Sequence, residues 1–490
     1  MTSSCPLTAA EQRRNLILFA LCIGLEYLAA PVLYVGITQA SLCDHLGADT
    51  LTANLPAMLY FAMTAVPTLV AWASPSVRVL QRNLAICFGL TALTLGLTAL
   101  ALHRDVSRDF KLWAVILQGA VSGATMTGAI AYLWEIIGRG SDEKHRGAAL
   151  SLAFGMGPVL AVLGSLGQTA LLGGTIFGWQ FAGVGSPQSF VALYGLGVPI
   201  MILGTILACF FVVPPVADEP SREPVREVVG VLVGLPLMFA SVLLVQGDWG
   251  TSAVWLRVLG YLAALGATAG FVYHFRTILQ QPVLLVATLV TILVYTANMI
   301  PSNMNLYSAE VLGDLPEKYA GQQNMLRFGF KVAAGLFLGW LLTRTHPRAG
   351  VLTTASLYLA AMLWATLVTG PWYLVAFGLY GAGELIGVYA PNYIVSASRP
   401  SELRRNMAFV SLLMVPAAPA GYLFGAVADL AIRNQWTGLG WTSRQLGFRI
   451  SFLACAACVL LGMLIARALL PKHPQPPADV PANSPPNASR

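Results

Sequence analysis

Charged residues are scarce in this sequence. Only 10% of its 490 residues are Asp, Glu, Lys or Arg, whereas 57% are hydrophobic, and the mean hydropathy is +0.70. About a quarter of the residues of a soluble domain are charged, so this composition excludes an ordinary soluble fold. The sequence therefore predicts an all-α, polytopic membrane protein.

Other absences narrow the function. The net charge of +7 comes from basic residues scattered singly through connectors, which argues against nucleic-acid binding. The six histidines lie in or near connectors and the seven cysteines form no Cys/His cluster, so we expect no metal and no cofactor. HExxH, nucleophile-elbow and phosphate-loop motifs are missing in suitable contexts. We therefore expect a protein that is not an enzyme and does not use ATP.

Long apolar stretches dominate what is present. About 20 apolar residues cross a bilayer, and on that basis the sequence predicts about fourteen transmembrane helices. They are expected near 15–40, 52–73, 83–102, 112–138, 147–172, 189–213, 228–246, 253–274, 282–304, 321–343, 350–369, 372–396, 406–430 and 447–470.

The connectors predict the orientation. With the N-terminus inside, the cytoplasmic connectors carry most of the Arg and Lys, and those near 43–50 and 178–189 carry none. Five basic residues depart from this bias: Arg104, Arg108, Lys111, Arg433 and Arg444. We expect a cell (inner or plasma) membrane protein with both termini cytoplasmic. The first span is too long for a signal peptide, so it should remain in the mature protein.

The two halves of the sequence resemble each other. A shift of 266 positions aligns Arg78 with Arg344 and Arg82 with Arg348, and a shift of 259 aligns Arg146 with Arg405. The repeat predicts a six-helix bundle over 1–214, a linker with an inserted hairpin over 215–280, and a second bundle over 281–470. Residues 471–490, rich in Pro, Asn and Ser, are expected to form a disordered tail.

In this organisation the chain resembles the major facilitator superfamily, in its form with fourteen helices. The resemblance implies a secondary transporter of a small-molecule substrate that works by alternating access in the lipid bilayer. We expect a monomer that binds the substrate and protons and no nucleic acid.

Two acidic residues lie in the middle of apolar spans. Glu26 is in the first span and Glu384 in the twelfth. A charge there costs roughly 3 kcal/mol or more, so it persists where a cavity or a partner receives it. The resemblance places both on helices that line the central cavity, and a desolvated carboxylate takes up a proton more readily. Both are candidates for proton coupling; a structural hydrogen bond is the alternative.

Further polar and aromatic residues are candidates for the substrate cavity. Four residues of the ninth span share one helical face, which either contacts substrate or forms a polar seam between helices. Arg327 and Lys331 also share a face, and would attract an anionic substrate, balance buried carboxylates or extend to the membrane surface. The full set is Tyr27, Tyr34, Gln118, Tyr295, Asn298, Ser302, Asn305, Arg327 and Lys331.

Arginines at helix ends are candidates for a cytoplasmic gate. Gly339-Trp-Leu-Leu-Thr-Arg344 followed by Arg348 is similar to part of a superfamily motif, with Thr343 in place of its Asp. An Arg at a helix end can pair with a carboxylate on a neighbouring helix and hold one face closed, or can simply anchor the topology. The candidates are Arg78, Arg82, Glu135, Arg146, Arg344, Arg348 and Arg405, with Glu135 as partner of Arg78 or Arg82.

A glycine and proline motif bears on the direction of transport. Gly155-Met-Gly157-Pro158 in the fifth span is similar to the kinked-helix motif of superfamily antiporters, and it favours export. Gln118-Gly119 matches part of a drug-efflux motif whose Arg is here Val115, which weakens a simple drug/proton exchange. Uptake of a sugar, peptide or organic anion by proton symport is the alternative. A receptor or lipid-handling protein without transport is the second.

Overall fold

The computed structural model describes residues 7–398 and 410–474, apart from 74–76, 141–142, 177–178, residue 411 and most of 214–253. Within these ranges the chain is mostly helical, as the sequence predicts. A two-stranded antiparallel sheet, β1 (Thr175–Ile176) with β2 (Trp179–Gln180), lies in one connector.

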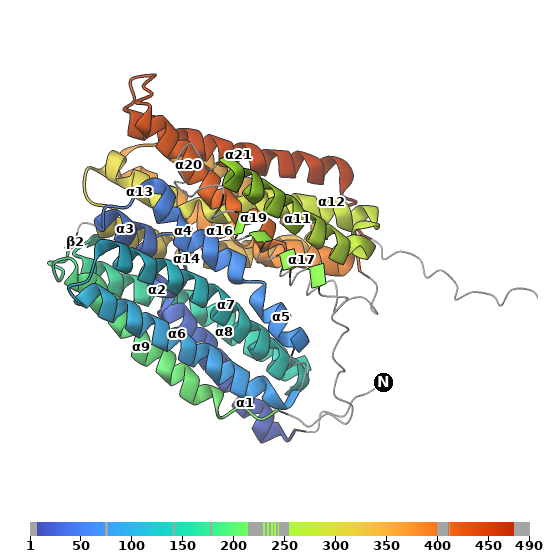
Figure 1. Cartoon of the computed structure of the whole chain (residues 1–490). Coiled ribbons are helices and arrows are strands. Elements are labelled where there is room, and N and C mark those ends of the chain that lie inside the picture. Colours follow the sequence, from blue (N-terminus) through green and yellow to red (C-terminus); the bar gives the residue numbers. More distant parts are fainter. Residues whose placement is uncertain are drawn as a thin grey trace, which may run out of the picture.

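The first half of the chain forms one group of packed helices (Figure 1). Its elements are α1 (Ala9–Leu28), α2 (Ala30–Leu33), α3 (Thr38–His45), α4 (Thr50–Met63), α5 (Val66–Ala73), η1 (Val77–Val79), α6 (Leu80–His103), α7 (Arg108–Gly140), α8 (Glu143–Leu172) and α9 (Gln188–Ala208).

The second half forms another group, against which α11 (Val254–Leu279) packs through α12. Its elements are α12 (Pro282–Tyr295), η3 (Thr296–Met299), α13 (Pro301–Leu312), α14 (Glu317–Arg344), α15 (Pro347–Leu367), η4 (Gly370–Leu374), α16 (Val375–Gly383), α17 (Ile386–Ser396), α19 (Met414–Ala417), α20 (Pro419–Arg433) and α21 (Ser443–Leu469).

Ten stretches of the described residues are long and apolar enough to cross a membrane, fewer than the fourteen expected from sequence. The predicted first span is helical but divided into α1, α2 and α3. The apolar parts of α8 and α11 are shorter, at Met156–Leu172 and Val258–Ala267. The predicted span 228–246 falls largely outside the described residues.

Two of the helical breaks lie against each other. The chain between α2 and α3 turns at Gly36, whose φ of +113° is unfavourable for residues with a side chain. The η3 segment and Pro301 interrupt the span from α12 to α13. A Cβ on Gly36 would lie 3.1 Å from the Pro301 ring. The two groups therefore approach closely where the backbone of each is irregular.

Contacts between the groups gather at one end, which carries the connectors 46–49, 173–187 and 434–442 and which we call the closed end. There α8 packs against α14, α4 against α20, and α3 against α13. Toward the other end, where α1 begins and α21 ends, the axes of the two groups diverge (Figure 1).

Buried polar residues join the groups at the closed end. Ser41 donates to Asn305 at 2.8 Å, Asn54 to Asn303 at 2.7 Å and Asn324 to Gln168 at 3.0 Å. Each such hydrogen bond contributes about 1 kcal/mol.

Ion pairs lie at the rim of the closed end. They join His45 to Glu317 (3.4 Å), Asp44 to Arg444 (3.5 Å) and Asp49 to Arg433 (3.1 Å). All three connect the first group to the second.

Candidate functional site

Glu384 lies between two cations of α14. Arg327 Nε donates to its Oε2 at 2.9 Å and Arg327 Nη2 to its Oε1, while Lys331 Nζ is 2.7 Å from Oε2. The Arg327 side chain is 3% exposed and that of Glu384 11%. Burying these charges is costly unless they are paired, and the fork of Arg327 pairs with both carboxylate oxygens. The sequence left open whether Arg327 and Lys331 attract a substrate, balance buried carboxylates or extend to the membrane surface. In this structure both pair with the buried carboxylate of Glu384.

Glycines bring α14 and α16 close enough for this pairing. A Cβ on Gly381 would lie 2.0 Å from the backbone oxygen of Arg327, and one on Gly378 would lie 2.7 Å from the Phe330 ring. Glu384 follows directly after α16, where the helix breaks before α17. The sequence thus places a polar side chain at a helix interruption, a common arrangement at transporter sites.

An aromatic cluster joins this ion cluster to the first group of helices. The rings of Tyr27 and Tyr34 stack with centroids 5.9 Å apart, and Phe328 of α14 meets both edge-on at 6.1 and 5.5 Å. Arg327 and Lys331 lie over the face of Phe328 at 5.5 and 5.3 Å. The predicted residues Tyr27, Tyr34, Arg327 and Lys331 are therefore gathered in one place, at the junction of the two groups.

Glu26 directly precedes Tyr27 of this cluster in α1. It is 3% exposed, and its Oε1 has no hydrogen-bond partner among the described residues. Among the described residues, the titratable groups that interact electrostatically with Glu26 are cysteines and tyrosines: Cys22, Tyr27, Tyr34, Tyr60 and Cys87. Tyr27 and Tyr60 are also within reach of Glu384. The two predicted acids thus have different surroundings: Glu384 is paired with two cations, and Glu26 forms no ion pair with a described residue.

The glycine and proline motif of α8 acts through packing. A Cβ on Gly157 would lie 2.4 Å from the Tyr27 ring, and one on Gly164 would lie 2.2 Å from the backbone oxygen of Leu28. Pro158 lies inside α8 without ending it. The motif therefore lets α8 approach α1 and fixes where Tyr27 lies; the surroundings of Gly155 are outside the described part.

The remaining predicted cavity residues contact protein. Asn298 accepts from Tyr358 and donates to Met414, and Asn305 belongs to the closed end. Gln118 donates to the backbone of Val32 at 3.1 Å. Tyr295 and Ser302 are buried, and Ser302 Oγ has no partner among the described residues. In this conformation the polar stripe of the ninth span is largely a seam within the protein.

The predicted gate residues are placed separately. Glu135 forms an ion pair with Arg139, one turn along α7, with Arg139 Nη2 2.6 Å from Glu135 Oε1. The sequence pattern did not predict this pairing. Arg348 donates to the last carbonyls of α21, and Arg344 lies over the Trp340 ring. Arg78 and Arg82 are exposed at η1 and the start of α6. The side chain of Arg146, and Arg405 entirely, fall outside the described residues.

Sequence reasoning missed Phe328 and Tyr60, as well as the pairing of Gln168 with Asn324. The one sequence signal for Phe328 was its position directly after Arg327, a predicted cavity residue. Gln168 and Asn324 are ordinary polar residues on helices far apart in sequence. Only the packing of α8 against α14 reveals that they meet.

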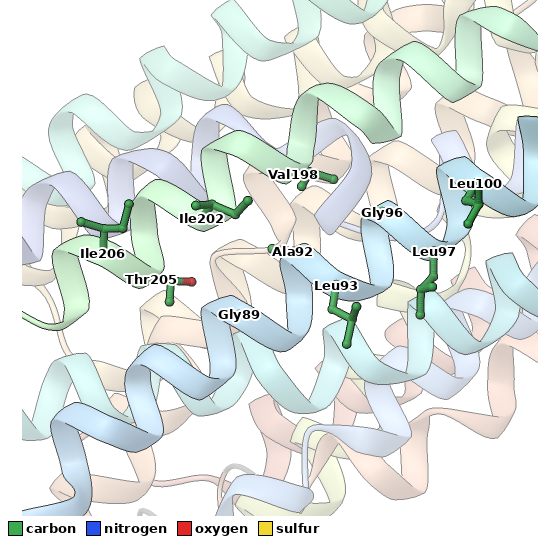
Figure 2. A pocket seen from close by; sticks show the side chains of 10 residues that line it. All are labelled: Gly89, Ala92, Leu93, Gly96, Leu97, Leu100, Val198, Ile202, Thr205 and Ile206. Atoms are coloured by element: carbon green, nitrogen blue, oxygen red, sulfur yellow. The ribbon is translucent and has the colours of Figure 1, made fainter.

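A groove elsewhere on the molecule is unsuited to a polar solute. It lies between α6 and α9 and is lined by apolar side chains, with Thr205 as the one hydroxyl (Figure 2). Leu93, Leu97 and Ile202, which line it, are about half exposed, as expected for a surface that faces lipid. Within the described residues, no three His, Cys, Asp or Glu side chains are arranged to hold a metal ion.

Comparison with known proteins defines the family. A profile of the Major Facilitator Superfamily matches residues 18–414, and the chain therefore belongs to this superfamily of membrane transporters. No curated protein matches the sequence at a significant level.

Solved transporter structures share the fold. The POT family transporter PepTSo is 11% identical with a TM-score of 0.63, covering 94% of this chain and 99% of its own. A D-xylose-proton symporter is 12% identical with a TM-score of 0.59 (94% and 98%). The nucleoside transporter NupG is 11% identical with a TM-score of 0.57 (92% and 98%). At these identities the likeness shows the fold alone.

Proposed function

We propose that this protein is a secondary active transporter that moves a small organic solute together with protons by alternating access. One observation carries the proposal. A buried carboxylate with an unpartnered oxygen, Glu26, directly precedes Tyr27 of the aromatic cluster. A second carboxylate, Glu384, pairs with the two cations that lie over Phe328 of the same cluster.

Glu26 is the better candidate for the coupling residue. Burial with an unpartnered oxygen favours the neutral form of Glu26 in this conformation, whereas a carboxylate held by Arg327 and Lys331 is stable as an anion. A change in surroundings during opening would load or release a proton on Glu26 and leave Glu384 ionised. Protonation of Glu26 can then bias the equilibrium between the inward-open and outward-open conformations, because the free energy of protonation differs between them.

The structure supports a state that is closed at one end. Besides the packing of α8 on α14 and of α4 on α20, the groups are joined at the closed end by a few hydrogen bonds and partly exposed ion pairs. Each of these polar contacts contributes about 1 kcal/mol or less, so they can break and re-form in a transport cycle. We place the closed end on the outer side of the membrane and both termini in the cytoplasm, following the distribution of Arg and Lys. The fourteen-helix form, with bundles over 1–214 and 281–470, remains part of this proposal.

The charges around the site bear on the direction of transport. In an exchanger, solute and proton compete for one carboxylate, an arrangement that suits cationic solutes. Arg327 and Lys331 would repel a cation. The glycine motif that favours export is explained here by the packing of Gly157 on Tyr27. Symport, the uptake alternative, is therefore the better supported direction.

Reconstitution tests the proposal. Purified protein in liposomes that contain a pH-sensitive dye is screened with a compound library for solute-driven proton flux. We expect flux in the wild type and in Glu11→Gln, an exposed carboxylate on the same helix, and none in Glu26→Gln. Flux that survives in Glu26→Gln would reject Glu26 as the coupling residue. Solute binding without flux would favour the receptor alternative.

A further inference from the structure

The charges around the site do not balance when Glu26 is neutral. Arg327 and Lys331 supply two positive charges, and Glu384 supplies one negative charge. Among the described residues, Glu384 is the one acidic group that forms an ion pair with these cations. The cluster then has one uncompensated positive charge in the interior of the membrane.

A buried donor remains unused in the same cluster. Arg327 Nη1 has no hydrogen-bond partner among the described residues, although the residue is only 2% exposed. Leaving a charged donor unsatisfied in a buried position costs free energy. Lys331, whose side chain is 15% exposed, is the more accessible of the two cations. The cluster can therefore receive another acceptor, with Lys331 at its open side.

We propose that the transported solute is an organic monoanion, a carboxylate or its equivalent, and that it crosses together with the proton of Glu26 as an electroneutral pair. This inference rests on the proposed function and adds the class of substrate. The anionic group is received by Lys331 and Arg327, and the apolar or aromatic body lies against Tyr27, Tyr34 and Phe328.

Charge balance supplies the coupling. In the empty site with Glu26 ionised, the charges of Arg327, Lys331, Glu384 and Glu26 sum to zero, although both cations pair directly with Glu384 alone. In the loaded site, the bound anion replaces the charge that Glu26 loses on protonation. Both states are neutral and can be enclosed between the helix groups. A site with the proton alone or the anion alone carries a net charge, and enclosing it in a low-dielectric interior is costly. Proton and solute are thus obliged to cross together.

Aromatic rings suit such a solute. Phe328 lies edge-on to both tyrosines and under both cations. A flat apolar group can stack on these rings while its carboxylate reaches Lys331. A neutral polar solute would leave the excess positive charge unpaired.

The test uses proteoliposomes and a library sorted by charge, in which carboxylates are matched with their neutral amides; N-acetylphenylalanine and its amide are one such pair. We expect the compounds that drive proton flux to be monoanions. Their uptake should accelerate when the exterior is acidic and remain unchanged when a potassium gradient with valinomycin imposes a membrane potential. Glutamine is neutral, so Glu26→Gln resembles the protonated state permanently. In this variant the exchange of internal for external anion (counterflow) should therefore persist.

A matched pair of variants identifies the cation. Lys331→Met should raise the concentration of anion for half-maximal flux by about tenfold or more, because a buried charge partner is lost. Lys318→Met, which removes an exposed lysine of the same helix, should leave it unchanged.

The outcomes separate this inference from the proposed function. Proton flux driven by amides or cations, or flux that responds to membrane potential, would overturn the monoanion inference and leave proton-coupled transport standing. Absence of proton flux with every compound would remove both.

Discussion

At the scale of the residue, the ion cluster of Glu384 is the most tightly constrained feature of the site. Its carboxylate interacts with two cations, and all three side chains are largely buried. A buried pair adds little net stability compared with apolar residues, but removing one partner leaves the other charge uncompensated.

We therefore expect Glu384→Gln to lower the melting temperature of the purified protein markedly. Breaking a buried pair costs about 3–5 kcal/mol. The double variant Glu384→Leu/Arg327→Met should recover part of the loss, because the two substitutions are coupled. Thermal unfolding in detergent, followed by tryptophan fluorescence, measures this.

The control is Lys318→Met, whose pair with Asp314 is exposed and should have no measurable effect on the melting temperature. A melting temperature of Glu384→Gln equal to that of the wild type would show that the cluster is not structural.

Single residues also show what sequence can reveal. Charge inside an apolar span singles out Glu26 and Glu384 because its cost is independent of the fold. The helical spacing of Arg327 and Lys331 predicts a shared face. Which carboxylate they approach is decided by the crossing of α14 with α16, and no local pattern encodes it. For the same reason, the sequence could not show that Glu26 forms no ion pair within the part of the chain that the structure describes.

At the scale of the element, helix breaks and glycine contacts place the site. Among the described residues, ten of the fourteen predicted spans coincide with stretches long and apolar enough to cross a membrane, since about 20 apolar residues are needed per crossing. The apolar pattern does not show that the first span divides into three helices, at Ala29 and again around Gly36. Nor does it show that the second of these breaks meets Pro301. Those features depend on backbone geometry and on contacts between distant segments.

The crossing of α1 and α8 yields a prediction for Gly157→Ala. Its added Cβ would lie 2.4 Å from the Tyr27 ring, so the ring must move. We expect overpacking of about 1–3 kcal/mol and at least a severalfold loss of transport rate. Gly167→Ala, on the same helix, is the control, because its Cβ meets no described atom within 4 Å. Equal transport rates in the two variants would contradict a role for this contact.

At the scale of the whole molecule, the closed end decides which side of the membrane can reach the site. The helix groups touch there through small residues. A Cβ on Gly321 would lie 2.0 Å from Thr169 Oγ1 and 2.7 Å from the backbone oxygen of Ser165. Both atoms belong to the other group, so this spacing exists only while that end is closed.

Gly321→Ala should therefore shift the equilibrium toward opening of the closed end. The measurement is the distance between spin labels on Ser107 and Thr437, in a background without native cysteines. We expect a longer-distance population to grow in Gly321→Ala and not in Gly335→Ala, whose Cβ meets no described atom within 4 Å. Identical distance distributions would show that the Gly321 contact does not hold this end closed.

A histidine gives the closed end a response to pH. A hydrogen bond to Glu317 raises the pKa of His45 above its ordinary value of about 6.5. His45 also faces Asp44 and the Phe190 ring. The protonated form is favoured in the closed state, so its contribution is fully present below the ordinary pKa. It is lost as the pH rises through the raised value.

The same spin-label pair tests this response. Between about pH 6 and 9 we expect the long-distance population to increase with pH in the wild type and to respond less in His45→Gln. The control is His103→Gln, which changes an exposed histidine at the last position of α6. An unchanged pH response in His45→Gln would assign the effect to another group.

The ion pairs at the rim of the closed end are sensitive to the salt concentration of the surrounding medium. In the pair of Asp49 with Arg433 the side chains are 39% and 70% exposed, and the pair of Asp44 with Arg444 is partly exposed as well. Dissolved ions screen such charges over about 8 Å at physiological ionic strength and about 30 Å in dilute solution. If this end faces outward, salinity acts directly on the equilibrium. A dilute medium strengthens the attraction that keeps the transporter shut to the exterior, and a saline medium weakens it.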